Sequence, residues 1–193
     1  MIHEHYIIYK PYGYLSQFVN NQTKRKNKKL LGSLFSFPEG SMAVGRLDEK
    51  SEGLLIITTD GQISEQIRSK KVEKEYWVMV DGQITSEACN ILANGIEITT
   101  NDGIYKTLPC KVLPISTPNN IPERKVRDDK HGVTSWMSIT ICEGKFRQIR
   151  KMTSKVGFPT LRLVRVRVGS YSLETYSNNF IQSLSGIDID FFF

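Results

Sequence analysis

Apolar and polar residues alternate with a period of two over much of the chain, and this pattern predicts β-strands. One segment, 54–57, is apolar without interruption and predicts a strand buried on both faces. Other segments are rich in aromatic and β-branched residues, which favour strands. The predicted strands cover residues 5–10, 42–46, 54–57, 73–80, 96–99, 104–112, 135–142 and 161–168. An Asn101-Asp102-Gly103 turn joins 96–99 to 104–112 as a hairpin.

Two of these strands have faces of different character. In 73–80, the period of two places Tyr76, Val78 and Val80 on one face and Trp77 on the other. By this pattern alone, Tyr76 is a core residue. Strand 161–168 has an apolar face, formed by Val164, Val166 and Val168. Its other face is basic and carries Arg165 and Arg167.

Helical spacing predicts helices at 62–69 and 86–93, the second with Thr85 as N-cap and Gly95 as stop. The polar, basic segment 20–29 predicts a loop. Either this loop is a solvated surface feature or it is an arm that binds RNA phosphates. We therefore expect an α+β fold dominated by strands, with two or three helices.

A third helix is predicted at 145–156, where an apolar stripe at spacings of three and four is formed by Phe146, Ile149, Met152 and Val156. Arg150 falls at the edge of this stripe, which places it to reach into a cleft. The proline-rich segment 114–132 shows no periodicity and predicts a loop or hinge between two lobes.

Positive charge is concentrated in short windows of this 193-residue chain, whose net charge is +6 and whose pI is about 9.2. Clustered cations of this kind are an electrostatic footprint for nucleic acid. They lie within 24–29 and 145–155, and at Arg162, Arg165 and Arg167.

Several classes of protein are disfavoured by the sequence. No apolar run approaches the ~18 residues of a membrane span, and the N-terminus lacks a signal-peptide pattern, so we expect a cytoplasmic protein. Scattered cysteines and an isolated His3–His5 pair predict neither a disulfide framework nor a metal site. No cofactor motif is present, and we expect none to be needed.

The loop between the predicted strands 42–46 and 54–57 carries Arg46 and Asp48. Loops held between rigid strands are common sites of chemistry, but aspartates in turns are also common as surface charges. Spacing alone leaves both interpretations open.

The sequence VGRLDEKSEGLLIITTDG, residues 44–61, resembles the catalytic signature of the pseudouridine synthases, in the variant typical of the branch that acts on ribosomal RNA. Other motifs resemble the same branch, in the same order along nearly the whole chain. They are YKPYG at 9–13, KEYWV at 74–78, EGKFRQIRKM at 143–152 and VGFPTLRL at 156–163.

This resemblance implies a mixed, mostly antiparallel bent sheet in two lobes around a basic cleft, with flanking helices. It implies one bilobal catalytic domain over 1–193, with no room for the N-terminal S4-type domain that many relatives carry. The implied activity is isomerisation of one uridine to pseudouridine in 23S (large-subunit) ribosomal RNA. We expect a monomer whose partner is that RNA, without membrane or cofactor.

The resemblance also implies roles for individual residues. Asp48 would be the catalytic carboxylate, Arg150 its cationic partner, and Tyr76 the ring that packs on the target base. Leu163 would support that base, and Arg46 would fill the space that a flipped base leaves. Phosphate contacts are expected from Lys145, Arg147, Arg165 and Arg167.

Competing hypotheses remain open at this stage. One is a non-catalytic RNA-binding or ribosome-assembly protein on the same fold. Another is a glycoside hydrolase, which usually needs two carboxylates, with Asp60 as the nearest second candidate. For the synthase itself, Asp48 could attack C1′ as a nucleophile or remove the 2′ proton to give a glycal.

Overall fold

The computed structural model describes residues 3–19, 27–68, 72–127, 131–173 and 177–184. The basic window 24–29 and the loop 20–29 therefore lie partly outside the described residues, as does the end of the predicted helix 62–69. In the described part of the chain, no helix is long and apolar enough to cross a membrane.

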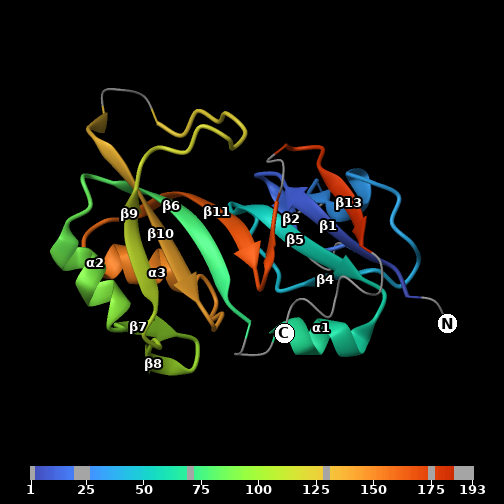
Figure 1. Ribbon diagram of the computed structural model, residues 1–193, viewed down its shortest axis with the longest axis horizontal. Helices are drawn as coiled ribbons and strands as arrows, with labels where there is room; N and C mark the ends of the chain where they lie inside the picture. The colour runs from blue at the N-terminus through green and yellow to red at the C-terminus, as the bar shows by residue number, and fades with distance from the viewer. Residues whose placement is uncertain (1–2, 20–26, 69–71, 128–130, 174–176, 185–193) are drawn as a thin grey trace.

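One large sheet runs through the molecule (Figure 1), and its strands pair in the order β13-β1-β5-β11-β6-β10-β9. Short strands β4 and β12 add to β5 and β11 respectively. The bounds are β1 His5–Lys10, β4 Met42–Val44, β5 Glu52–Thr58, β6 Lys74–Asp81, β9 Lys111–Ile115, β10 Thr134–Ile141, β11 Thr160–Val168, β12 Tyr171–Ser172 and β13 Ile181–Leu184.

Among the described residues, the remaining elements form two small two-stranded sheets and several helices. They are β2 Tyr14–Leu15 with β3 Lys29–Leu30, β7 Glu97–Thr100 with β8 Gly103–Lys106, α1 Gly61–Arg68, α2 Ser86–Ala93, α3 Gln148–Lys155 and η1 Leu31–Ser33. The predicted α+β class and the mostly antiparallel mixed sheet are confirmed.

The centre of the large sheet is the pairing of β5 with β11, which is parallel, whereas its other strand pairs are antiparallel. Figure 1 shows α2, α3 and the β7–β8 hairpin with one half of the molecule and α1 with the other. Hydrophobic clusters lie on both sides of the β5–β11 pairing, which is called the seam below, and a further cluster covers the other face of β1 and β5.

The apolar faces predicted for two strands are confirmed. Tyr76, Val78 and Val80 of β6 all lie in one cluster. The three valines of β11 lie in the other cluster. The prediction for α2 is also confirmed, because this helix covers Ser86–Ala93 and the Thr85 side chain accepts a hydrogen bond from the Ala88 amide.

The predicted single strand at 104–112 is wrong. The chain forms β8 and β9 with a break between them. In the break, residues 107–110 make backbone hydrogen bonds to the end of α2 and the residues after it, and not to a neighbouring strand. The Thr107 amide donates to the Ile96 carbonyl, and the Cys110 amide donates to the Ala93 carbonyl. Pro109 has no amide hydrogen to donate to a ladder.

The predicted loop at 114–132 begins later than expected. Pro114 and Ile115 belong to β9, where Pro114 pairs with Met137. Proline is tolerated there because β9 is the edge strand of the sheet.

The predicted helix at 145–156 is too long, since α3 begins at Gln148. Arg147 adopts a left-handed backbone conformation, with φ of 54°. The helix therefore cannot extend N-terminally past this residue. Phe146 is consequently 65 % exposed and does not belong to the apolar stripe, whereas Ile149 and Met152 are buried as predicted.

Candidate active site

Asp48 lies on the loop that connects β4 to β5. The preceding residue, Leu47, is buried, and its amide and carbonyl both bond to the Ser16 hydroxyl at 3.0 and 2.8 Å. The Gly13 amide donates to the Glu49 carbonyl at 2.8 Å. The segment after β1 therefore fixes the loop on both sides of Asp48, whose side chain remains 31 % exposed.

The end of the loop requires a glycine. Gly53 pairs with Arg165 across the parallel β5–β11 seam and has φ of +104°. A Cβ added at Gly53 would lie 2.2 Å from the Arg165 carbonyl oxygen. Only glycine permits the two backbones to come this close. Their contact fixes the point at which the Asp48 loop joins β5.

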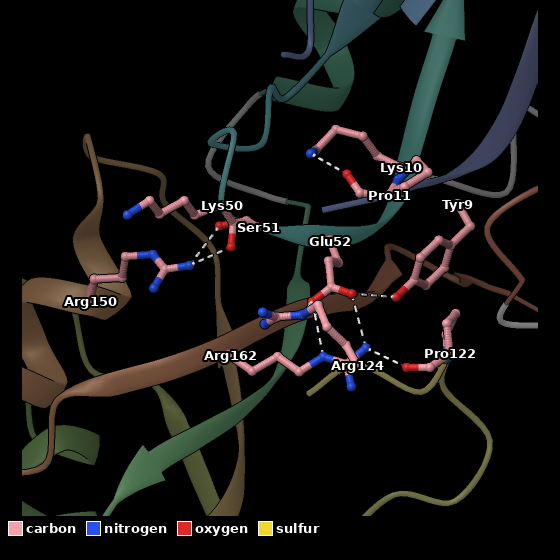
Figure 2. Close-up of polar contacts among 10 residues, drawn as sticks. All are labelled: Tyr9, Lys10, Pro11, Lys50, Ser51, Glu52, Pro122, Arg124, Arg150 and Arg162. Atoms are coloured by element: carbon pink, nitrogen blue, oxygen red, sulfur yellow. Dashed lines mark hydrogen bonds and ion pairs between the residues drawn. The ribbon is translucent and has the colours of Figure 1, made fainter. Parts of the chain in front are cut away.

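Arg150 comes from α3 and reaches across to the same loop (Figure 2). Its Nη2 donates to the Lys50 carbonyl at 2.8 Å and to the Ser51 hydroxyl at 3.3 Å. Its Nε lies 3.9 Å from Asp48 Oδ2 and is buried without a hydrogen-bond partner within the described chain. Burial lowers the pKa of Arg150, and the charge of Asp48 opposes this shift.

Two other predicted site residues lie in a hydrophobic cluster. Tyr76 of β6 and Leu163 of β11 are both buried and belong to this cluster. Leu47 and Ile149, the neighbours in sequence of Asp48 and Arg150, belong to it as well. The same cluster thus connects four of the sequence motifs.

Comparison with known proteins identifies the family of this chain. The profile of the RNA pseudouridylate synthase family matches residues 4–155. A ribosomal large subunit pseudouridine synthase E of Xanthomonas campestris is 39 % identical over 174 residues, which cover 86 % of this chain and 88 % of that protein. The chain belongs to the RNA pseudouridylate synthase family. The predicted family is therefore confirmed.

Two further similarities support this membership. A ribosomal large subunit pseudouridine synthase E of Vibrio parahaemolyticus is 41 % identical over 171 residues, covering 86 % of this chain and 68 % of that protein. A crystal structure of a pseudouridylate synthase superposes with a TM-score of 0.77 at 22 % identity, covering 100 % of this chain and 74 % of that one. The latter likeness establishes the pseudouridine synthase fold.

Three of the cations predicted to contact RNA are exposed. Arg46 is exposed, and no polar contact of its guanidinium is found within the described part of the chain. Lys145 is exposed, with its Nζ 4.6 Å from the ring centre of Tyr105. Arg147 is exposed and lines an open groove together with Arg150.

The arginines of β11 do not form the expected basic face. Arg165 is buried, and its guanidinium donates to the carbonyls of Leu54 and Gly45. Arg167 pairs with Glu73 at 3.0 Å and Glu75 at 3.1 Å. These contacts hold both guanidinium groups against the protein, although Arg165 Nη2 is buried without a hydrogen-bond partner within the described chain and the Arg167 side chain is 27 % exposed. The phosphate role expected for Arg165 and Arg167 stays a prediction.

Lys10 is a residue near the site to which the sequence analysis assigned no role. It is fully buried, and its ammonium donates to the carbonyls of Pro11 and Tyr14 at 2.9 and 2.8 Å. Burial lowers the pKa of Lys10 to about 7, although the charges of Glu52 and Asp48 oppose this shift. The sequence signal that could have identified Lys10 is a lysine at the end of an apolar strand, directly before a proline.

Glu52 is a second such residue, and it sits at the seam (Figure 2). It is 2 % exposed, and both of its oxygens accept from Arg162 at 2.9 Å. Arg124 adds a bond of 3.1 Å to the same carboxylate and stacks over the Tyr12 ring at 4.3 Å. This network ties the segment before β10 to β5 and β11, and it explains Arg162, which the sequence analysis counted among RNA-binding cations.

Asp60 has a local structural role. Its carboxylate accepts hydrogen bonds from the Gln62 and Ile63 amides at the start of α1, which is the bonding of a helix cap. Within the described residues, no group of three or more His, Cys, Asp or Glu side chains could hold a metal ion.

Proposed function

We propose that this protein isomerises one uridine to pseudouridine in large-subunit ribosomal RNA, with Asp48 as the catalytic carboxylate. The observation that carries the proposal is the Asp48–Arg150 ion pair, at 3.9 Å, formed by two of the motifs that carry the family resemblance. The names of the large-subunit relatives support the choice of RNA.

The reaction needs no co-reactant. The N1–C1′ glycosidic bond breaks, the base turns, and C5 bonds to C1′. C5 then loses its proton and N1 gains one, so substrate and product are isomers. Asp48 can serve as nucleophile at C1′ or as base for the 2′ proton, and both routes need an ionised carboxylate.

Arg150 supplies the positive charge that this carboxylate needs in a partly buried site. Its bonds to the Lys50 carbonyl and the Ser51 hydroxyl hold the guanidinium against the Asp48 loop. The same bonds leave Nε directed to the carboxylate, and a cation fixed in advance loses little entropy when the substrate arrives.

Base flipping gives Tyr76, Leu163 and Arg46 their proposed roles. A stacked uridine must leave its helix before its glycosidic carbon can reach Asp48. Tyr76 and Leu163 offer an apolar surface for the extruded base, and the exposed guanidinium of Arg46, two residues before Asp48, can fill the vacated space. Lys145 and Arg147 bind phosphates in this proposal.

The proposal is tested by mapping pseudouridine in large-subunit RNA with carbodiimide adducts and primer extension. We expect wild type to give one new stop and Asp48→Asn to give none. Asp60→Asn is the matched control, because asparagine also caps a helix, and we expect it to give the wild-type stop. No stop with wild type, on both naked RNA and immature particles, would favour the non-catalytic RNA-binding protein.

Arg150 is tested separately from RNA binding. We expect Arg150→Ala to abolish turnover and to leave the dissociation constant for RNA within a few-fold of wild type, because Asp48 loses its counter-charge while the exposed cations remain. Near-normal turnover of this variant would remove Arg150 from the site.

We further propose that the protein acts as a monomer in the cytoplasm, where bacterial ribosomal RNA is made. The bacterial ribosomal names of its relatives support the location. Light scattering of the purified protein tests the monomer, and a dimer at micromolar concentration would contradict it.

A further inference from the structure

Phe146 is the most exposed aromatic side chain in the described part of the chain, at 65 %. Helical spacing placed it in the core, yet the backbone turns it outward just before α3 begins. An exposed phenylalanine loses the hydrophobic contribution of burial. Its exposure leaves the ring available to a partner.

The turn that carries Phe146 is held rigidly at both ends. Gln148 accepts a hydrogen bond from the Lys145 amide at 2.9 Å and donates to Glu143 at 2.6 Å. The buried Glu143 also accepts from the Tyr105 hydroxyl and the Leu108 amide. This network spans the turn, so Phe146 is presented to solvent by a fixed support.

Strain in the backbone points the same way. Arg147 is the only non-glycine residue with a positive φ among the described residues. A left-handed conformation is costly for a residue with a side chain, and such strain gathers at functional sites. Here the left-handed conformation of Arg147 turns the chain between Phe146 and the first residue of α3.

Phe146 lines an open groove of about 630 Å³ between α3 and β7, two elements that pack together. Cations outnumber acids on its walls: Arg147, Lys151 and Lys155 line it, against Glu97. The Lys151 ammonium lies 5.5 Å from the centre of the Phe146 ring. An aromatic ring among cations suits a nucleic-acid strand, which offers a base to the ring and phosphates to the cations.

The groove shares one residue with the candidate active site, because Arg150 lines it as well. Arg150 thus touches the Asp48 loop with its guanidinium and borders the groove. A strand whose uridine is extruded to Asp48 must continue on one side or the other of Arg150. The groove offers that path.

We propose that the single-stranded RNA next to the target uridine lies in this groove, and that Phe146 stacks on a base flanking the target. Lys151 and Lys155 then contact the phosphates of the same segment. The proposal rests on the proposed function, since it takes RNA as the substrate. It makes Phe146 a substrate-binding residue that selects for an unpaired nucleotide beside the target.

The test measures binding of a uridine-rich RNA of about a dozen nucleotides that carries one 2-aminopurine. Removal of a stacking aromatic weakens binding by roughly 5- to 150-fold, and we expect this loss for Phe146→Ala. Phe146→Tyr should restore both the affinity and the quenching of 2-aminopurine that stacking causes. Leu113→Ala is the matched control, because Leu113 is also 65 % exposed but lies on the edge strand β9.

Turnover on the mapped uridine separates this inference from the proposed function. We expect Phe146→Ala to reduce the single-turnover rate at low RNA concentration and to recover most of it at saturating RNA. Wild-type affinity and quenching for Phe146→Ala would overturn the stacking proposal even if wild type forms pseudouridine. Absence of pseudouridine with wild type would instead reject the function, while the binding comparison still decides the role of Phe146.

Discussion

Replacement of Glu52 by glutamine should strongly destabilise the protein. Glu52 is the carboxylate of the seam between the two halves, and its two oxygens accept bonds from Arg162 and Arg124. Glutamine removes the charge and presents an amide NH₂ to guanidinium donors. Arg162, whose side chain is 5 % exposed, would then be a buried cation without its anion.

The expected magnitude follows from this burial. Removing one partner of a buried ion pair costs about 3–5 kcal/mol, because the other charge is left uncompensated. A typical domain has only about 5–15 kcal/mol of total stability. Glu52→Gln should therefore lower the urea midpoint by about 1–2 M, for a denaturant slope of roughly 2–3 kcal/mol/M. Trp136, which is buried in β10, provides the fluorescence signal.

Two comparisons make the measurement decisive. Lys111→Gln breaks the exposed Glu73–Lys111 pair, whose lysine side chain is 73 % exposed, and should cost less than about 1 kcal/mol. The double variant Glu52→Leu/Arg162→Met removes both charges and should recover at least half of the loss. A loss below about 1 kcal/mol for Glu52→Gln would show that the seam pair contributes no more than a surface pair, and would refute the reasoning.

Three further predictions concern the loop, a buried lysine and the cations. Gly53→Ala should lower the melting temperature sharply because its Cβ meets the Arg165 carbonyl, whereas Gly61→Ala, with open space, should be neutral; equal melting temperatures would contradict this. The pKa of Lys10 is lowered to about 7 in the folded protein. Between pH 7 and the ordinary pKa of lysine, the unfolded chain therefore binds more protons than the folded protein. The stability of wild type should rise relative to that of Lys10→Met over pH 7–10, by up to about 1.4 kcal/mol per pH unit. A flat difference in urea midpoints across that window would refute the burial argument. Arg147→Gln should reduce the salt slope of RNA binding by about one, and Arg167→Gln should leave it unchanged; a reduced slope for Arg167→Gln would mean that its pairing with Glu73 and Glu75 opens on RNA.

Local pattern was sufficient for much of the fold, and the resemblance of the motifs to a known family located the candidate site. The boundaries of α2 and the faces of β6 followed from spacing, because each depends on which side of a single element is apolar. The motifs placed Asp48 and Arg150 in one site, although 102 residues of sequence separate positions 48 and 150.

Other features were decided by contacts between distant segments. Helical spacing placed Phe146 in a helix, but the Glu143–Gln148 network and the left-handed Arg147 expose it. Strand periodicity identified a basic face on β11, yet it could not show that Glu73, Glu75 and main-chain carbonyls would cover it.

The sequence by itself determined the family, the strands and the residues available for chemistry, since these depend on residue types and short-range spacing. Only the tertiary structure decided which cations remain free to meet RNA. A guanidinium is available to a phosphate only when no carboxylate or carbonyl of the protein already satisfies it. In Arg162, Arg165 and Arg167 those partners come from segments far away in the sequence, so these contacts could not be deduced from the local pattern.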